Sequence, residues 1–294
     1  MNQPDFTRRL LPLHKLLRWG IESLQAAEIP SARLDAELLM GAVLGLSRAQ
    51  VLARTHTTVR RPQRGHYAAL IQRRLRGEPV AYILGQREFY GRDFHVDRRV
   101  LIPRPETEEL VDRALDRLDG CEAPRVADIG TGSGAIAVTI AAECVAAHVD
   151  ATDASSAALT VAEANATRHA VAARITFREG SLLEPLRDQP PYDLIVANLP
   201  YVGTNETGAL APDVRDFEPH EALFAGPEGL DLFPAFFDQL AEFDLLKEGG
   251  AVLLEIGYAQ GAALLALARR RFPAWAVALH RDLAGLDRMV ELRR

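Results

Sequence analysis

Apolar residues recur at helical spacing through the first 85 positions of the chain, and no strand pattern interrupts them. From Leu10 to Leu24 an apolar residue returns every three or four positions, which is the spacing of one helix face. Ser31 and Ser47 each precede a further apolar stretch, where a serine hydroxyl can accept a hydrogen bond from a free N–H of the first turn. We therefore predict that residues 1–85 form a small helical bundle.

Residues 86–103 change to an alternation of apolar and polar positions, with Gly91 near the middle. Such an alternation around a glycine is typical of a β-hairpin. We expect this hairpin to link two domains. Pro105 follows, at a position suited to the first turn of a helix, and the glutamates after it suit a helix N-terminus.

From Arg125 onward, short apolar runs alternate with helical stretches. The predicted strands are Arg125–Gly130, His148–Asp153, Arg174–Glu179, Asp193–Asn198 and Gly250–Ile256, and the predicted helices lie around 135–145, 155–168 and 229–247. This alternation predicts a doubly wound parallel α/β sheet whose ligand lies at the carboxyl ends of the strands. The segments 276–280 and 288–292 are expected to close the sheet as an antiparallel pair. We assign residues 104–294 to this second domain.

Composition limits the classes of protein without selecting one. The chain has 294 residues, of which 48% are apolar and 25% charged, as in an ordinary globular enzyme. Its net charge of −6 argues against a dedicated DNA-binding protein. A local cluster of arginines within residues 59–76 is either a solvated helix face or a docking surface for an acidic partner.

Cysteine use and hydropathy point to the cytoplasm. Cys121 and Cys144 have neither metal-binding nor redox spacing, and we interpret them as reduced packing residues. The first nine residues lack the apolar core of a signal peptide. No run approaches the ~18 apolar residues of a membrane span. We expect a soluble, cytoplasmic protein with no metal.

A glycine-rich segment follows the first strand of the predicted sheet. It contains Asp128, Gly130, Thr131, Gly132, Ser133 and Gly134. Glycines let a backbone turn tightly and approach a ligand closely, and the helix that follows offers free N–H groups. The spacing of the glycines also satisfies the sequence fingerprint of dinucleotide-binding domains. Asp128 favours S-adenosylmethionine instead, because a carboxylate there could meet the cationic amino-acid end of that molecule but would repel a pyrophosphate.

Two further strand ends supply candidate cofactor contacts. Asp153 ends the second predicted strand, where a carboxylate can accept hydrogen bonds from both ribose hydroxyls of a nucleotide cofactor. The alternative for Asp153 is a helix N-cap. Ser181 and Leu182 follow the third strand, at the height of an adenine ring, although Leu182 could equally be a core residue.

The segment Asn198-Leu199-Pro200-Tyr201 follows the fourth strand and carries the candidate catalytic chemistry. An amide nitrogen is a poor nucleophile, because its lone pair is delocalised into the carbonyl group. A site that methylates such a nitrogen has to position it and accept hydrogen bonds from its N–H groups, which the Asn198 side-chain oxygen and the Pro200 carbonyl can do. Tyr201 can stack on a planar group and exclude water. We expect Asn198 to contact both cofactor and substrate.

Several segments together resemble the release-factor glutamine N5-methyltransferases, over essentially the full length. They are 77–85, 89–91, Arg99–Glu108, Asp128–Ala137, 214–219 and 282–285. The chain departs from the family pattern at Leu199, where a second proline is usual, and at Ser181, where many relatives carry an acid. The first departure should alter loop stiffness more than chemistry, because the amide-accepting groups belong to residues 198 and 200.

The resemblance implies a Rossmann-like class I S-adenosylmethionine-dependent methyltransferase sheet with a small N-terminal helical-bundle domain. It implies that residues 1–85 recognise a peptide chain release factor, and that 130–134 and Asp153 bind the methyl donor. It also implies that residues 198–201, Leu199 included, bind the glutamine of a Gly-Gly-Gln loop, with S-adenosylhomocysteine as the product. We expect a monomer without direct nucleic-acid contacts.

Three competing interpretations remain at this point. A related enzyme class methylates a glutamine of a large-subunit ribosomal protein. Adenine-N6 DNA methyltransferases use a similar Asn/Asp-Pro-Pro-Tyr segment for a flipped base, although the net charge of −6 argues against them. A binding module without activity would require a dead site, whereas Asp128, Asp153, Asn198 and Tyr201 are all present.

Overall fold

The computed structural model describes residues 11–294, so the expected start of the first helix at Leu10 and the N-terminal end of the 1–85 bundle lie outside the described residues. The contacts divide the described chain into two compact units. One comprises residues 11–85 together with 211–217, and the other comprises 86–210 together with 218–294. Each unit is described by itself below.

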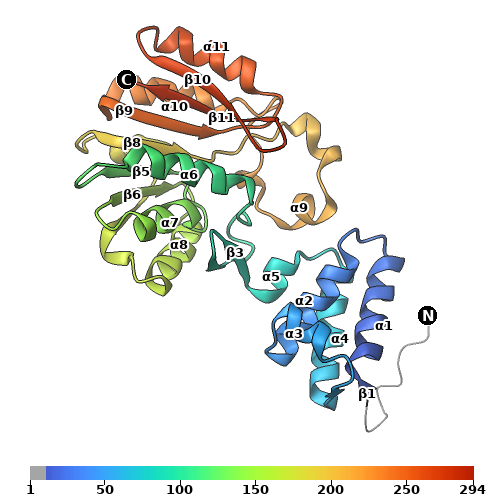
Figure 1. Ribbon diagram of the computed structural model, residues 1–294. Helices are drawn as coiled ribbons and strands as arrows, with labels where there is room; N and C mark the ends of the chain where they lie inside the picture. The colour runs from blue at the N-terminus through green and yellow to red at the C-terminus, as the bar shows by residue number, and fades with distance from the viewer. Residues whose placement is uncertain (1–10) are drawn as a thin grey trace. The chain divides into compact units, whose positions relative to one another are not determined.

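The first unit is helical, as its sequence pattern predicts (Figure 1). Its helices are α1 (Leu13–Ala26), α2 (Ala32–Leu44), α3 (Arg48–Ala53), α4 (Arg61–Leu75), α5 (Val80–Leu84) and α9 (Pro212–Phe217). Ser47 caps α3 in a capping box with Gln50, whereas the Ser31 hydroxyl donates to Asp35 instead of accepting from the backbone of α2. One strand pair was not predicted, because β1 (Leu11–Pro12) and β2 (Thr58–Val59) are only two residues each.

Two of the six arginines in the basic segment 59–76 lie in the interior of this unit. Arg64 is buried and its Nε donates to the carbonyl of Val59 at 2.8 Å. Arg74 is buried as well and pairs with Asp35 at 2.7 Å and with Asp213 at 3.2 Å. Arg73 forms a two-bonded pair with Glu78, and the remaining three, Arg60, Arg61 and Arg76, are exposed. The segment is therefore only partly a solvated helix face.

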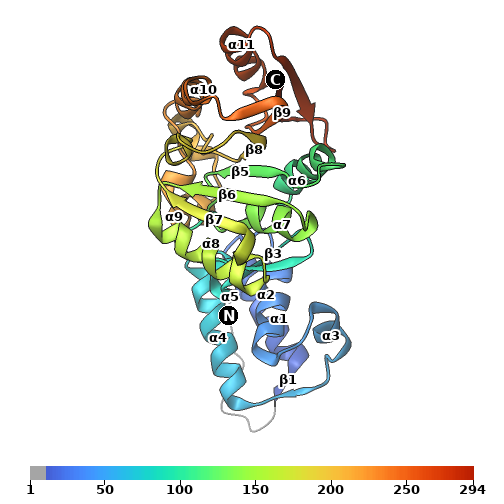
Figure 2. The same ribbon diagram turned by 90° about the vertical axis from the view of Figure 1, so that its left-hand side faces the viewer.

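The second unit is built on a seven-stranded sheet in the order β10-β11-β9-β8-β5-β6-β7. Its strands are β5 (Arg125–Ile129), β6 (His148–Asp153), β7 (Ile175–Glu179), β8 (Tyr192–Ala197), β9 (Leu246–Glu255), β10 (Ala276–Arg281) and β11 (Asp287–Arg293). Strands β5 to β9 are mutually parallel, and β11 runs antiparallel to both neighbours. The predicted α/β sheet and its antiparallel closing pair are confirmed. Figure 2 shows β9, β8, β5, β6 and β7 in succession.

Alternate residues of each strand face two separate cores, as the two-residue period of a strand requires. Val126, Leu194 and Leu253 pack into the first core, and Ala127, Ile195 and Val252 pack into the second. The first core is covered by α6 (Glu106–Leu118), α7 (Ala135–Glu143) and α8 (Ser156–Arg168). The second is covered by α10 (Leu232–Phe243) and α11 (Gly261–Arg271). Because both faces are covered, the strands read as continuous apolar runs.

The sequence prediction was wrong at the boundary between α10 and β9, where β9 begins four residues before the predicted Gly250, and it missed one helix. Helix α10 ends at Phe243, four residues before the predicted 247, because Asp244 takes a left-handed conformation (φ 52°) and β9 begins at Leu246. Helix α11 has no counterpart among the predicted helices, since its arginine-rich second half reads as polar. Short 3₁₀ turns complete the unit at 172–174, 184–186, 204–209 and 220–222.

The hairpin expected over residues 86–103 is shorter than that range. It consists of β3 (Gln86–Phe89) and β4 (Arg92–His95), which turn through Tyr90 and Gly91, both with positive φ. Beyond His95 the strand pattern does not continue, because Asp97 accepts a hydrogen bond from the backbone N–H of Arg99 and forms a turn. The alternation in 99–103 thus does not correspond to a strand.

Within residues 11–294, no helix is both long and apolar enough to cross a lipid bilayer. The same residues contain no group of three or more His, Cys, Asp or Glu side chains placed to hold a metal ion.

Candidate functional site

The candidate residues come together because their strands are neighbours. Strand β5 lies between β6 and β8, and Ile129 is in register with Thr152 of β6 and Ala197 of β8. The residue after each of these three, at positions 130, 153 and 198, therefore lies at the same carboxyl edge of the sheet. This edge is also where the strand order reverses, which is the ligand-binding position of open α/β sheets.

The glycine-rich segment forms a tight turn from β5 into α7. Gly130, Gly132 and Gly134 all have left-handed φ values, of 74°, 56° and 78°. A Cβ on Gly134 would lie only 3.1 Å from Ala162 of α8, so glycine also permits the close packing of the two helices. At Gly132 a Cβ would meet nothing within 4 Å, which leaves that part of the backbone open to a ligand.

Asp128 supports this turn from below. Its carboxylate is fully buried and accepts hydrogen bonds from the Thr131 hydroxyl at 2.7 Å and from the Ala137 N–H at 3.1 Å. Burial raises the pKa of Asp128 to about 7, against the lowering effect of these two donors. The structure thus places Asp128 beneath the turn and not at the surface of the cavity, so the expected meeting with a cationic amino-acid group is not what its contacts show.

Asp153 lies at the cavity surface and also organises the backbone. One carboxylate oxygen accepts from the N–H of Gly132 at 2.8 Å and the other from the N–H of Ser155 at 2.9 Å. Burial raises the pKa of Asp153, and the two backbone donors oppose that rise. The helix cap itself is Ser155, whose hydroxyl accepts from Ala158. Each Asp153 oxygen retains a lone pair for a ligand.

A cavity of about 400 Å³ opens at this edge of the sheet. Eight of the residues predicted from the sequence line it: Gly130, Gly132, Asp153, Ser181, Leu182, Asn198, Leu199 and Pro200. Five others support it from outside the lining: Asp128, Thr131, Ser133, Gly134 and Tyr201. Leu182 is held at φ 52° and its carbonyl accepts from the Thr152 hydroxyl at 3.0 Å, which fixes the wall after β7.

The Asn198 side chain is oriented by a neighbouring hydroxyl. Its Nδ2 donates to Thr107 Oγ1 at 3.2 Å, and Thr107 lies in the first turn of α6 and is buried. Among residues 11–294, neither the Asn198 Oδ1 nor the Pro200 carbonyl oxygen has a hydrogen-bond donor. Since both residues line the cavity, two acceptors are available at one wall.

Tyr201 is held at both of its polar ends. Its hydroxyl donates to Oε1 of Glu255 at 3.2 Å, and its carbonyl accepts from the Gln260 side chain at 2.8 Å. Gly229 approaches that carbonyl so closely that a Cβ there would lie 1.9 Å from the oxygen. Leu199 is buried, and its Cδ2 would lie 3.4 Å from a Cβ on Gly130. The loop after β8 is thus firmly anchored.

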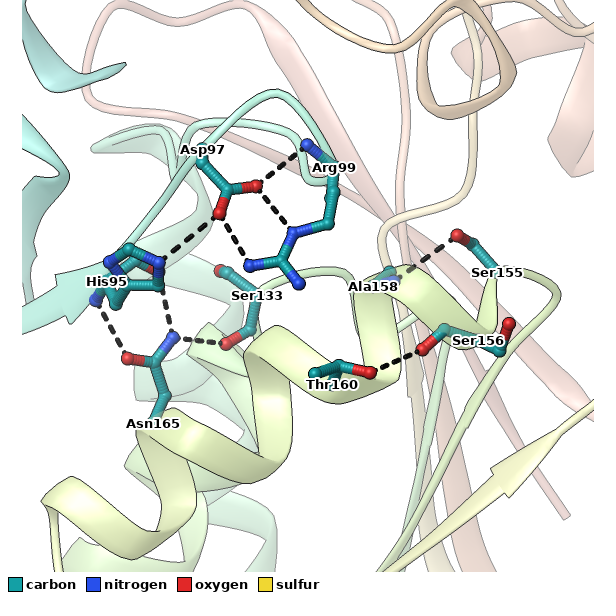
Figure 3. Close-up of polar contacts among 9 residues, drawn as sticks. All are labelled: His95, Asp97, Arg99, Ser133, Ser155, Ser156, Ala158, Thr160 and Asn165. Carbon is teal, nitrogen blue, oxygen red and sulfur yellow. Dashed lines mark hydrogen bonds and ion pairs between the residues drawn. The ribbon is translucent and has the colours of Figure 1, made fainter. Parts of the chain in front are cut away.

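A second polar network joins the hairpin to the glycine turn (Figure 3). The side chain of Asn165 on α8 accepts from the His95 N–H at 2.7 Å and donates to the carbonyls of His95 and Ser133, at 3.0 and 2.8 Å. Asp97 lies between His95 and Arg99, and hydrogen bonds from Arg99 lower the pKa of Asp97 to about 2. Arg99 itself lines the cavity.

Sequence reasoning missed several of these residues. Thr107 lies in the segment Arg99–Glu108, which carries part of the family resemblance, but nothing in that sequence indicates that it contacts Asn198. Glu255 is an acid at the end of a buried strand, the same signal that selected Asp153. Gln260 and Arg99 carry no comparable signal, because their partners lie far away in the sequence.

The cavity suits S-adenosylmethionine. Gly132 leaves open backbone, Asp153 offers acceptors for hydroxyl groups, and the wall near Leu182 is apolar, as an adenine ring requires. The volume falls within the ~300–1,000 Å³ of ordinary small-molecule sites. Residues 130–134, 153, 181–182 and 198 are the ones that would hold this molecule.

Comparison with known families agrees with this assignment. Residues 15–85 match the model of the PrmC N-terminal domain, and residues 109–212 match that of the methyltransferase small domain. The chain is 41% identical over 283 residues to a release factor glutamine methyltransferase of Nitratidesulfovibrio vulgaris, with 96% of this chain and 95% of the relative covered. It is 42% identical over 284 residues to the enzyme of the same name from Moorella thermoacetica, covering 95% and 97%.

Solved structures show the same fold at low sequence identity. The catalytic domain of hMettl16 in complex with the MAT2A 3′UTR hairpin 6 gives a TM-score of 0.56 at 14% identity, covering 81% of this chain and 84% of that one. A methyltransferase from Pyrococcus furiosus gives 0.50 at 17% identity, covering 76% and 96%. The fold is thus that of the class I methyltransferases, and the sequence relatives place the chain more narrowly: it belongs to the family of release factor glutamine methyltransferases, enzymes that use S-adenosylmethionine.

Proposed function

We propose that this enzyme transfers the methyl group of S-adenosylmethionine to the side-chain amide nitrogen of the glutamine in the Gly-Gly-Gln loop of peptide chain release factors. The names of relatives about 40% identical over nearly the whole chain support this substrate. The structural observation that carries the proposal is the orientation of Asn198. Its amide nitrogen is engaged by Thr107, so its oxygen is left as an acceptor at the cavity wall.

The chemistry required of the protein is positioning. The bound donor supplies an electrophilic methyl group on a sulfonium centre. Asn198 Oδ1 and the Pro200 carbonyl accept hydrogen bonds from the two N–H bonds of the substrate amide, which orients its nitrogen and increases its electron density. Tyr201, fixed at its hydroxyl and its carbonyl, anchors the loop that carries these two acceptors. No strong base is needed for this role, because the methylated nitrogen is acidic and releases its extra proton to solvent, which leaves a neutral N-methyl amide.

The proposal also assigns a separate role to each part of the chain. We assign release-factor recognition to residues 1–85, linkage to 86–103 and catalysis to 104–294. The enzyme acts as a cytoplasmic monomer and makes no direct contact with nucleic acid. S-adenosylhomocysteine leaves as the second product.

The test of the reaction is methyl transfer from labelled S-adenosylmethionine to purified release factor. A release factor with the loop glutamine changed to alanine is the matched control. We expect label on the parent factor alone. Label on both factors would contradict the assigned glutamine, and label on neither would redirect the search to a glutamine of a ribosomal protein and then to adenine in DNA.

Changing Asn198 to alanine is expected to reduce methyl transfer by at least about 100-fold, because the substrate amide loses an acceptor that has to be in place in the transition state. Donor affinity, measured by calorimetry, should change little. A variant that transferred methyl groups at close to the parental rate would refute the role of Asn198.

Changing Asp153 to alanine should instead weaken donor binding, since the carboxylate offers acceptors to the ligand and holds the N–H of Gly132 in place. We expect about a tenfold or larger increase in the dissociation constant for S-adenosylmethionine. Glu179, exposed at the end of the neighbouring strand β7, provides a control as Glu179→Ala. Equal donor affinity in Asp153→Ala and parent would overturn the assignment.

A further inference from the structure

A buried carboxyl group lies behind the loop that carries Asn198 and Tyr201. Glu255 ends strand β9 and is 1% exposed. Its Oε1 accepts the hydroxyl of Tyr201 at 3.2 Å, and its Oε2 is buried without a hydrogen-bond partner among residues 11–294. A buried carboxyl group lowers the stability of a fold when one of its oxygens lacks a hydrogen-bond partner. Such a group at this position therefore indicates a role other than stability.

Glu255 also reaches Asn198 through Thr107. The Thr107 hydroxyl accepts from Asn198 Nδ2, so its own hydrogen has to be donated elsewhere. The same hydroxyl lowers the pKa of Glu255 by hydrogen bonding, as does the hydroxyl of Tyr201. The Asn198 amide thus donates to Thr107, and the acceptor that interacts with Thr107 and can take its remaining hydrogen is the carboxyl group of Glu255.

The other charged groups near Glu255 do not neutralise it. Arg288 on β11 lowers the pKa of Glu255 through its charge, but its guanidinium is bound to Asp282 by two hydrogen bonds. Glu106 on α6 acts in the opposite direction. Burial is the largest influence and raises the pKa of Glu255 to about 7.

We propose that Glu255 is a positioning residue that fixes the hydrogen-bonding direction of the catalytic loop. As an acceptor it holds the Tyr201 hydroxyl directly and the Asn198 amide nitrogen through Thr107, so that the Asn198 oxygen faces the cavity. This inference rests on the proposed function, in which that oxygen accepts a substrate N–H.

The ionisation state of Glu255 then controls the loop. A carboxylate can only accept hydrogen bonds, whereas a carboxylic acid also donates one. Protonated Glu255 can donate a hydrogen bond to a hydroxyl. The hydrogen bonds along this path can then reverse direction, and the Asn198 side-chain amide can flip, which exchanges the positions of its oxygen and nitrogen. The competent orientation is therefore favoured above the pKa of Glu255 and weakened below it.

Side-chain amide NMR tests this independently of any substrate. Asparagine occurs only at positions 2, 165, 198 and 205, so protein labelled with ¹⁵N at asparagine gives few signals, and Asn198→Ala identifies the one of interest. We expect the Asn198 amide shifts to titrate near neutral pH in the parent and to lose that titration in Glu255→Gln. An unchanged titration in Glu255→Gln would overturn the proposal. Asp128, whose pKa is also about 7, is separated by this comparison.

Kinetics with release factor supply the second readout. We expect Glu255→Gln to lower kcat by about tenfold or more, with donor affinity retained, and to abolish the rise of kcat through neutral pH. Glu291→Gln is the matched control, because Glu291 is an equally buried acid on the adjacent strand β11 that pairs with Arg117 and His280. It should lower thermal stability but keep the parental pH profile. A Glu255→Gln profile with the parental inflection would contradict the proposal.

Substitutions at Thr107 separate positioning from folding. Thr107→Val keeps the shape but removes the hydroxyl and should reproduce the loss in kcat, whereas Thr107→Ser keeps the hydroxyl and should restore most of it. Equal activity of the two variants would refute the relay. If the parent enzyme failed to methylate release factor, the proposed function would fall, while the NMR titration would still decide the role of Glu255.

Discussion

At the residue scale, the site depends on two buried acids that the structure uses differently. Asp128 is fully buried beneath the glycine turn and receives two hydrogen bonds. Glu255 is equally buried behind the catalytic loop, where it accepts a hydrogen bond from Tyr201, and its Oε2 has no hydrogen-bond partner among residues 11–294. The first holds the glycine turn through the Thr131 hydroxyl and the Ala137 N–H, and the second holds the side chain of Tyr201, so their replacement should have different consequences.

Asp128 makes the stability of the enzyme depend on pH. Its pKa is about 7 in the fold and near 3.9 in an unfolded chain, so the folded state binds more protons between these values. The contribution of Asp128 to stability is then fully present below about pH 4 and is lost as the pH rises to about 7. The expected slope is about 1.4 kcal/mol for each pH unit within that window.

Chemical unfolding at several pH values between 4 and 8 measures this slope. The variant Asp128→Asn cannot ionise and should lose the part of the slope that belongs to residue 128. It should also be less stable than the parent at low pH, because the amide NH₂ group would replace the buried Oδ1, which has no hydrogen-bond partner among residues 11–294. Parallel pH curves for parent and variant would disprove the assigned titration.

At the element scale, one asparagine joins three segments of the second unit. Asn165 on α8 is fully buried and bonds both backbone groups of His95 in β4 and the carbonyl of Ser133 in the glycine turn. It thereby replaces the strand partner that β4 lacks on that side. The hairpin and the cofactor turn are positioned by the same side chain.

Changing Asn165 to alanine is expected to cost about 2–3 kcal/mol of unfolding free energy, because buried backbone groups lose their partners. The backbone N–H of His95 should also lose protection from hydrogen exchange. Thr160→Ala on the exposed side of the same helix removes one local bond to Ser156 and should cost less than about 0.5 kcal/mol. Similar losses for the two variants would contradict the special role of Asn165.

The elements themselves were predictable where a periodic pattern was long. The strands β5 to β8 begin and end within one residue of the predicted bounds, because an apolar run between polar turns is visible in the sequence. The hairpin over 86–103 was predicted too long. The alternation of apolar and polar residues continues in the sequence, but the turn formed by Asp97 and Arg99 ends the strand in the structure. Helix α11 was missed, because its burial depends on β10 and β11 closing the sheet.

At the scale of the whole molecule, each unit carries its own tryptophan. Trp19 is buried in the helical unit beside Tyr67, and Trp275 stacks on Phe272 in the other unit at 4.3 Å. The sequence contains only these two tryptophans. Fluorescence of single-tryptophan variants therefore reports the unfolding of each unit separately.

Changing Arg74 to alanine should destabilise the helical unit by about 3 kcal/mol or more, because it leaves the buried carboxylate of Asp35 without its charged partner. The midpoint reported by Trp19 in urea should fall, and the midpoint reported by Trp275 serves as the internal reference. Arg76→Ala, an exposed neighbour, should shift neither. A Trp19 midpoint unchanged in Arg74→Ala would show that the pair contributes little.

The sequence alone determined the helical first unit, the α/β sheet of the second and the two segments that meet at its edge. It could do so because periodicity and glycine-rich turns are local properties of the chain. Only the tertiary structure decided that Asp128 lies beneath the turn while Asp153 lies at the cavity, since both are acids near the end of a predicted strand in the sequence. It alone placed Thr107 and Glu255 behind Asn198 and Tyr201, because the direction of a hydrogen bond is set by groups that folding brings together from distant parts of the sequence.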